Sequence, residues 1–186
     1  MLDEIKLPNW RARVISAREK EGRRAISKWM QLATINKNNY PEVRTVVFRG
    51  WNKSSDLIIY TDSRSQKILS MKYTPNVEIC WLFAKSNIQF RFSGKAYIVN
   101  DENRLKYWNN ISLKSKKTWY WPSPLEKYNH KSFNINYDDK TQDLPDNFCV
   151  IYIHIEKVDE LNLNVYPHTR CIWERKNDWT EIKVNP

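Results

Sequence analysis

The chain has 186 residues, of which 31 are Lys or Arg and 21 are Asp or Glu, so its formal charge is +10 at pH 7. With 41% hydrophobic and 13% aromatic residues, the composition excludes a disordered basic tail and predicts a fold, which we take as a single domain over 1–186. The three glycines, Gly22, Gly50 and Gly94, are too widely spaced for a Gly-rich phosphate loop or a dinucleotide fingerprint.

The first predicted element is a helix that begins at Pro8, in the stretch PNWRARVISAREKE. Proline suits the first turn of a helix, and Trp10, Val14 and Ala17 recur at helical spacing. Short runs rich in β-branched and aromatic residues follow, separated by the polar turns NKNN, NKSS and AKSN, and this pattern predicts antiparallel strands. These runs are MQLATI, VRTVVFRGW, DLIIYT, VEICWLF and IQFRFSGKAYIV.

Two further helices are predicted within and after this series of strands. The segment SRSQKILSMKYTP is apolar at Ile68 and Met71 and ends at Pro75. The segment DENRLKYWNNISLKSKK follows the fifth strand and predicts one continuous helix, with Leu105 and Trp108 facing inward.

The stretch from Trp121 to Asn147 is rich in proline and polar residues, which predicts a long ordered loop over the surface. The chain closes with the runs NFCVIYIHI, VDELNLNV, TRCIWER and DWTEIKV, each interpreted as a strand. About eight short strands with a few helices between them predict a mainly β fold with flanking helices, arranged as a barrel.

The strand VRTVVFRG carries two cations, Arg44 and Arg49, and their odd separation puts them on opposite faces because side chains alternate along a strand. Beyond the next strand, the turn before the second helix holds Ser63, Ser65 and Lys67. A helix N-terminus, a hydroxyl and a point charge could together hold a phosphate without glycine. The alternative is that Ser63 or Ser65 simply caps the helix, and the local sequence alone favours this alternative.

The three cysteines, Cys80, Cys149 and Cys171, are odd in number and form no C-x-x-C pair, which argues against a disulfide framework and a thiolate zinc site. The three histidines show no H-E-x-x-H spacing, so we predict no metal site. The apolar runs are too short to span a membrane, and the acidic start MLDEIKLPNW does not resemble a secretion signal. These features together favour the cytoplasm.

Several motifs together resemble one known family. The series LAT, RTVVFRG, YTDSRSQK, IQFRFSGKA and the terminal HTR…W…VNP has the order and separations of the pyridoxamine 5′-phosphate oxidase-like family of FMN-binding split barrels. The early P-x-W, the CW-x-F strand, the WP-x-P turn, the NFC strand and the closing NP resemble a branch known only as FMN-dependent enzymes. The likeness covers most of the chain, and it implies an FMN-binding split β-barrel that forms a homodimer with FMN between its subunits.

The resemblance also implies which residues hold the cofactor. They are Arg44, Thr45, Val46, Val47, Arg49, Tyr60, Thr61, Ser65, Gln66, Lys67, Gln89 and Arg170. Ser65, Gln66 and Lys67 would hold the phosphate, and Gln66 is a departure because the oxidases proper have arginine there. A cationic set without glycines suits a phosphomonoester, and the 9 Trp, 10 Tyr and 6 Phe suit a large buried interface.

On the substrate side, the resemblance implies Tyr107, Ser115 and His168 as substrate-binding residues and assigns no catalytic residue. Two arginines of the family are replaced here, by Ile111 between Tyr107 and Ser115 and by Tyr166 near His168. These replacements disfavour pyridoxamine 5′-phosphate as the substrate. His168 is explained equally well as a turn histidine whose ring is satisfied locally.

The leading hypothesis is an FMN-dependent oxidoreductase that takes a hydride from a small molecule, whose identity the sequence leaves open. One alternative is pyridoxamine or pyridoxine 5′-phosphate oxidase proper, and another is a flavin-binding protein without fast turnover. An alternative of a different class is a barrel that binds single-stranded nucleic acid, supported by the +10 charge and by strands such as IQFRFSGK that alternate basic and aromatic side chains. The ordered set of motifs disfavours nucleic acid, because that hypothesis leaves the set unexplained.

Overall fold

The computed structural model describes residues 7–133 and 143–186, and the predicted acidic start of the chain therefore lies outside the described residues. The strands are β1 Trp29–Ile35, β2 Pro41–Trp51, β3 Leu57–Asp62, β4 Asn76–Phe83, β5 Ile88–Ile98, β6 Phe148–Asn162, β7 Thr169–Glu174 and β8 Ile182–Val184. The α-helices are α1 Asn9–Glu21, α2 Gln66–Tyr73, α3 Asp101–Asn109 and α4 Leu113–Lys116. Short 3-10 turns cover Ala25–Lys28, Ala84–Ser86, Lys117–Tyr120, His130–Phe133 and Arg175–Asn177.

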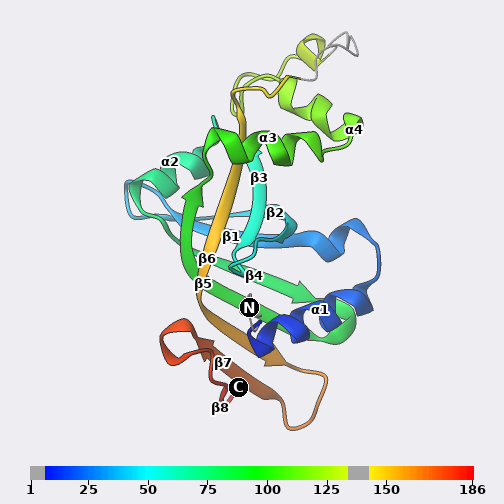
Figure 1. The fold of residues 1–186 in the computed structure, drawn as a ribbon, viewed down its shortest axis with the longest axis vertical. Helices are drawn as coiled ribbons and strands as arrows, with labels where there is room; N and C mark the ends of the chain where they lie inside the picture. Colours follow the sequence, from blue (N-terminus) through cyan, green and yellow to red (C-terminus); the bar gives the residue numbers. More distant parts are fainter. Residues whose placement is uncertain (1–6, 134–142) are drawn as a thin grey trace, which may run out of the picture.

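The strands form one antiparallel sheet in the order β3-β2-β1-β4-β5-β6-β7-β8. Because β3 also pairs with β6, the first six strands close into a barrel, and β7 and β8 extend the sheet beyond it (Figure 1). The prediction of a mainly β barrel with flanking helices is confirmed.

The first helix covers the lower end of the barrel, as Figure 1 is drawn. Trp10, Val14 and Ala17 are all buried, so the predicted helical spacing is confirmed. The Trp10 ring lies 5.6 Å from that of Trp51 and 5.9 Å from that of Phe92, measured between centroids. Such tilted aromatic contacts add to the large apolar area that each ring removes from water.

The two runs NFCVIYIHI and VDELNLNV form one strand, β6, and the prediction of two separate strands was wrong. The polar pair Glu156 and Lys157 between them lies at a bulge, where the pairing of β5 with β6 shifts register, and not in a turn. The backbones approach closely here, since a Cβ built on Gly94 would lie 2.1 Å from the carbonyl oxygen of His154. Glycine at this position lets a single strand pass through the bulge.

The predicted continuous helix over 101–117 is divided into α3 and α4. The Ser112 side chain accepts a hydrogen bond from the backbone N–H of Ser115 at 3.4 Å, so a serine cap begins a new helix in place of continuing the first. Trp108 is fully buried as expected, but Leu105 is 49% exposed, so its predicted inward orientation was wrong.

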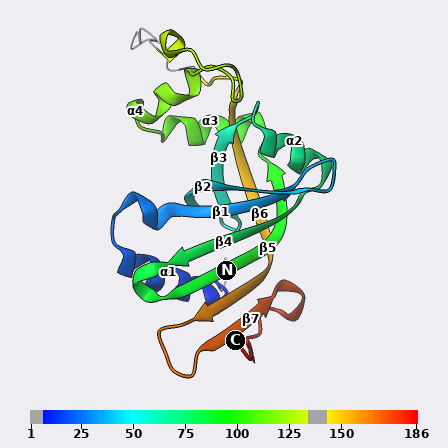
Figure 2. The same ribbon diagram turned by 180° about the vertical axis from the view of Figure 1, so that it is seen from behind.

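The segment 117–133 extends beyond the barrel at the end that carries α3 and α4 (Figures 1 and 2). Arg64, in the turn before α2, donates to the Ser123 hydroxyl at 2.9 Å and to the carbonyl oxygen of Trp121 at 3.2 Å. These bonds fix one end of the predicted surface loop, and residues 134–142 of that loop lie outside the described residues.

Candidate functional site

Four polar side chains meet where β2, β3 and the start of α2 come together, and we call this group the cationic cradle. Its members are Arg44, Thr61, Ser65 and Lys67. The Lys67 ammonium donates to the Thr61 hydroxyl at 2.9 Å and to the Ser65 hydroxyl at 3.0 Å. The ammonium is therefore held by two neutral oxygens, and its third hydrogen can be donated to an anion.

Ser65 occupies the N-cap position of α2, but its side chain makes no capping bond. Its hydroxyl donates instead to the carbonyl oxygen of Asp62 at 2.7 Å. The alternative that Ser65 simply caps the helix is therefore wrong. The first turn of α2 is left without a side-chain cap, and uncapped N–H groups at a helix start favour a bound anion.

Arg44 approaches the cradle from β2. Its guanidinium donates to the Thr34 hydroxyl at 2.6 Å and forms an ion pair with Glu42 at 3.1 Å. Glu42 in turn accepts a hydrogen bond from the Ser70 hydroxyl of α2 at 3.2 Å. This chain of contacts holds Arg44 beside the helix that carries Lys67.

The electrostatics of the cradle favour an anion. Burial lowers the pKa of Lys67, and the charge of Arg44 lowers it further. Burial also lowers the pKa of Arg44, against the opposing effect of Glu42. Glu42 is paired with Arg44 and Asp62 with Arg64, so the Lys67 ammonium is left as an excess positive charge that a phosphate would balance.

The remaining predicted cofactor residues of β2 and α2 are divided between two faces. Val46 is 7% exposed and its side chain belongs to the barrel core, so only its backbone could contact a ligand. Thr45 and Arg49 are exposed and Val47 is half-buried, on the opposite face from Val46, and Gln66 is exposed on α2. The prediction that Arg44 and Arg49 lie on opposite faces is confirmed. Arg44 is two residues from the buried Val46 and shares its face, whereas Arg49 is three residues away, on the exposed face.

The outer face of the barrel carries a second group, the tyrosine cluster, formed by Tyr60, Tyr107 and Tyr152. The ring centroids of Tyr60 and Tyr107 are 5.8 Å apart, and the hydroxyls of Tyr107 and Tyr152 are 2.6 Å apart. The Arg49 guanidinium lies over the Tyr60 ring at 5.2 Å. Ile111, one turn after Tyr107 in sequence, packs against the same side of the molecule.

Ser115 is placed on α4, beside the residue that caps this helix. Its hydroxyl accepts a hydrogen bond from the Ser112 hydroxyl at 3.1 Å. The predicted substrate residue therefore has a local structural role at the start of α4.

A third group, the lower row, consists of Gln89, Leu161 and Arg170, which are aligned across β5, β6 and β7. Arg170 forms a two-point contact with Asp159, with distances of 3.0 and 2.7 Å. Arg91 bonds to the same carboxylate. Although burial opposes it, hydrogen bonds from Arg170 and Arg91 lower the pKa of Asp159, so the carboxylate is charged and orients both arginines.

His168 lies in the exposed connection between β6 and β7. Its Nδ1 is 2.9 Å from the carbonyl oxygen of Val165, and its ring lies 6.4 Å from that of Tyr166, which is 94% exposed. The contact with the Val165 carbonyl supports the interpretation of His168 as a turn histidine whose ring is satisfied locally.

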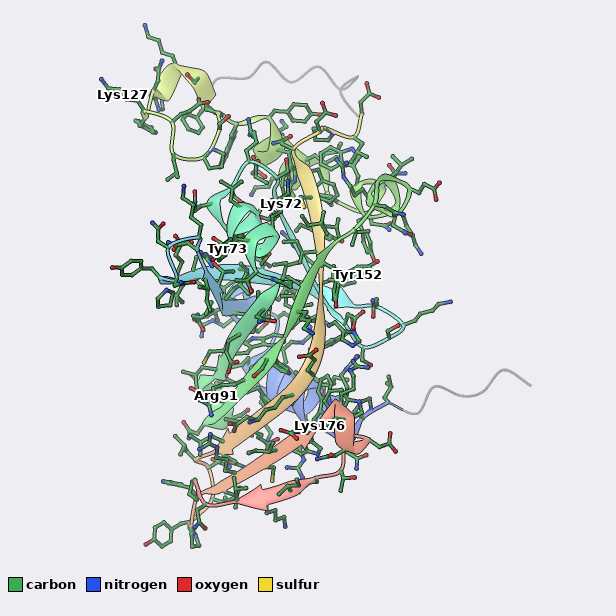
Figure 3. All side chains as sticks on the ribbon, turned by 90° about the vertical axis from the view of Figure 1, so that its left-hand side faces the viewer. Lys72, Tyr73, Arg91, Lys127, Tyr152 and Lys176 are labelled. Atoms are coloured by element: carbon green, nitrogen blue, oxygen red, sulfur yellow. The ribbon has the colours of Figure 1, made fainter. Side chains whose placement is uncertain are left out.

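The cationic cradle and the lower row lie in different halves of the molecule. Figures 1 and 2 agree in placing α2 in the upper half, below α3, and β7 near the lower end. Figure 3 shows Lys72 of α2 in the upper half and Arg91, two residues from Gln89, in the lower half. One copy of the chain therefore does not bring all the predicted cofactor residues together.

The sequence interpretation missed Tyr152 of the tyrosine cluster and Asp159, the carboxylate that orients Arg170 of the lower row. Alternation in the run NFCVIYIHI places Tyr152 on the face opposite Ile151 and Ile153, and this was an available signal. A carboxylate inside the apolar run VDEL was the corresponding signal for Asp159. Their partners come from distant segments, so the contacts themselves were not predictable.

Within residues 7–133 and 143–186, no helix is long and apolar enough to cross a membrane. The same part of the chain contains no group of three His, Cys, Asp or Glu side chains placed to hold a metal ion.

Comparison with known proteins gives a consistent result. Residues 7–100 match the family model described as pyridoxamine 5′-phosphate oxidase, FMN-binding domain. A curated relative, pyridoxine/pyridoxamine 5′-phosphate oxidase 2 of Arabidopsis thaliana, is 34% identical, and the match covers 95% of this chain and 96% of the relative.

Two solved structures have the same fold. A pyridoxamine 5′-phosphate oxidase-related, FMN-binding protein of Nostoc punctiforme superposes with a TM-score of 0.90 at 27% identity, over 98% of this chain and 100% of the other. PhzG of Burkholderia lata, solved with tetrahydrophenazine-1-carboxylic acid, has a TM-score of 0.77 at 18% identity, over 95% of this chain and 89% of the other, and shows likeness of fold alone.

These matches explain the ordered motifs that the nucleic-acid hypothesis left unexplained. The chain belongs to the pyridoxamine 5′-phosphate oxidase family of FMN-binding split barrels.

Proposed function

We propose that this protein binds FMN and uses it as an oxidoreductase of a small molecule. The observation that carries the proposal is the cationic cradle, where Lys67 is held by two hydroxyls beside Arg44 at the uncapped start of α2. A phosphate monoester fits this donor set, because it presents several acceptor oxygens and close to two negative charges.

The cationic cradle and the lower row have different parts in this proposal. Lys67, Ser65, Thr61 and Arg44 hold the phosphate, while Gln89 and Arg170 bind the flavin ring system. The chemistry supplied by bound FMN is acceptance of a hydride from the substrate. Asp159 fixes the direction of the Arg170 guanidinium, so that this positive charge is ordered before a ligand arrives.

We further propose that the site is shared between two copies of the chain. The cradle and the lower row lie in different halves of one copy, so a ligand that contacts both needs a second subunit (Figure 1). The outer face of the barrel also exposes large apolar side chains, as an interface between subunits would require. These include Ile35, Val43, Leu82, Tyr97 and Ile98.

The dimer has a direct test. Light scattering of the purified protein is expected to give about twice 22.5 kDa, with one FMN bound per chain. A monomer that retains FMN stoichiometrically would contradict the shared site, because Gln89 and Arg170 could not then reach the same ligand as Lys67.

The cofactor is expected to be FMN and not FAD. The cradle offers one group of cations at one helix start, and the sequence lacks the glycine pattern that supports a dinucleotide. Flavin released by heat should migrate with FMN on chromatography. Release of FAD, or failure of the apoprotein to bind FMN on reconstitution, would contradict the assignment.

A second candidate is pyridoxine or pyridoxamine 5′-phosphate oxidase proper, favoured by the name of the Arabidopsis relative. Ile111 and Tyr166 weigh against it, because neither offers a charge to a substrate phosphate. Anaerobic addition of pyridoxamine 5′-phosphate to the FMN-loaded protein separates the two candidates, since rapid bleaching of the flavin absorbance is expected only from the oxidase proper.

The three cysteines are free thiols. Free thiols persist in a reducing compartment, and we propose the cytoplasm on this ground, with residues 1–186 acting as a single domain.

A further inference from the structure

The hydroxyl pair of Tyr107 and Tyr152 is a feature that the cofactor site does not use. The two oxygens are 2.6 Å apart, joining α3 to β6, and the rings meet edge to face with centroids 6.2 Å apart. Figure 3 shows Tyr152 beside the upper half of β6, the half that faces α3 in Figure 1. Tyr152 thus lies next to Tyr107, the residue that the family resemblance assigns to substrate binding.

The pair has a hydrogen to spare. Two phenol hydroxyls carry two hydrogens, and the bond between them uses one. Burial raises the pKa of Tyr107, and the neighbouring Tyr152 raises it further, so Tyr107 remains a neutral phenol at physiological pH. The second hydrogen is available to an acceptor atom of a ligand.

The surroundings of this pair are mainly aromatic and apolar. Tyr60 packs on Tyr107 with centroids 5.8 Å apart, and Ile111 contributes an apolar side chain to the same cluster. The Arg49 guanidinium lies over the Tyr60 ring. The Lys116 ammonium is buried over the Trp108 ring at 4.9 Å. Aromatic walls of this kind suit a planar ring.

The balance of charge limits what can bind beside the pair. A phosphate monoester carries about 1.5 to 2 negative charges at pH 7. The hydroxyl pair offers it two neutral phenols, while Arg49 is held over the Tyr60 ring and Lys116 over the Trp108 ring. An uncompensated charge in a partly buried site is costly, whereas a hydroxyl or carbonyl group needs only the spare hydrogen bond.

Resting on the proposed function, we infer that Tyr152 is a specificity-determining residue. With Tyr107 it recognises the far end of the substrate through hydrogen bonds. The substrate is a planar ring compound that ends in an uncharged hydroxyl or carbonyl group and carries no phosphate.

Binding of two matched probes tests this inference without turnover. The probes are 4-deoxypyridoxine and its 5′-phosphate, which lack the group to be oxidised and differ only in the phosphate. Calorimetric titration of the FMN-loaded protein is expected to show at least tenfold tighter binding of the uncharged probe. Tighter binding of the phosphate, equal binding of both, or binding of neither overturns the inference.

A pair of hydroxyl deletions tests the role of Tyr152. Tyr152→Phe should weaken the uncharged probe about threefold to tenfold, the usual effect of losing a neutral hydrogen bond. Tyr40→Phe is the matched control, because Tyr40 is 69% exposed in the turn between β1 and β2 and belongs neither to the tyrosine cluster nor to the proposed interface, and it should leave binding unchanged. Equal effects of the two variants overturn the role of Tyr152.

Affinity for FMN, measured on the same proteins, separates this inference from the proposed function. If the parent protein binds FMN but prefers the phosphorylated probe, the substrate inference alone fails. If the parent does not bind FMN, the proposed function fails with it.

Discussion

Replacing Lys67 by alanine is expected to lower FMN affinity about 10- to 150-fold. The substitution removes a charge-assisted contact to the phosphate, which typically contributes about 1.5–3 kcal/mol. Two features of the structure point to a large effect. The ammonium is already oriented by Thr61 and Ser65, and burial has lowered its pKa, so a phosphate would meet an ordered and poorly solvated cation. Quenching of FMN fluorescence on titration with apoprotein measures the affinity.

Lys72→Ala is the matched control for this experiment. Lys72 lies in the last turn of α2, one and a half turns after Lys67, and it is exposed. Its removal changes the net charge equally and should leave FMN affinity unchanged. A similar loss in both variants would mean that general charge, and not the cradle, attracts the cofactor.

Arg44→Ala should weaken FMN to a similar degree. This variant also loses the bonds to Thr34 and Glu42, so its melting temperature has to be measured beside its affinity. If Lys67→Ala and Arg44→Ala both bind FMN like the parent, the cradle is not the phosphate site and the proposed function loses its main support.

The strands were predictable because their signal is local. Alternation and β-branched residues mark β1 to β5 within a few residues of their observed bounds. The bulge in β6 has a different origin, since it depends on the register against β5 and on the close approach at Gly94. A contact between segments about 60 residues apart leaves no periodic pattern in the sequence, so NFCVIYIHI and VDELNLNV were interpreted as two separate strands.

The contacts of the candidate site also differ in whether the local sequence could predict them. Ser65 and Lys67 lie in one short segment, so their association with a helix start could be predicted from the sequence. The bond between Tyr107 and Tyr152, and the contact of Asp159 with Arg91, join segments that only the closed barrel brings together. Closure places β3 against β6 and α3 over their outer face, and this arrangement depends on long-range pairing.

Ile111→Arg is expected to raise kcat/KM for pyridoxamine 5′-phosphate by about tenfold, through a new charge-assisted contact worth about 1.5 kcal/mol. Ile111 is half-buried beside Tyr107, so a longer side chain can extend from this position toward solvent while its guanidinium stays near the tyrosine cluster. The FMN affinity should change little, because Ile111 is not in contact with any member of the cradle in the described part of the chain. Steady-state kinetics and FMN titration of the same variant give the two values.

Ile111→Gln separates charge from shape in this experiment, since it removes the apolar surface and adds a polar end without a charge. If Gln raises the activity as much as Arg, relief of a steric or apolar block explains the gain, and the charge argument is wrong. If the parent protein already oxidises pyridoxamine 5′-phosphate efficiently, Ile111 does not exclude phosphate. The cation over Tyr60, Arg49, is then sufficient for a dianion, and the uncharged substrate inferred from Tyr107 and Tyr152 must be replaced by the phosphorylated one.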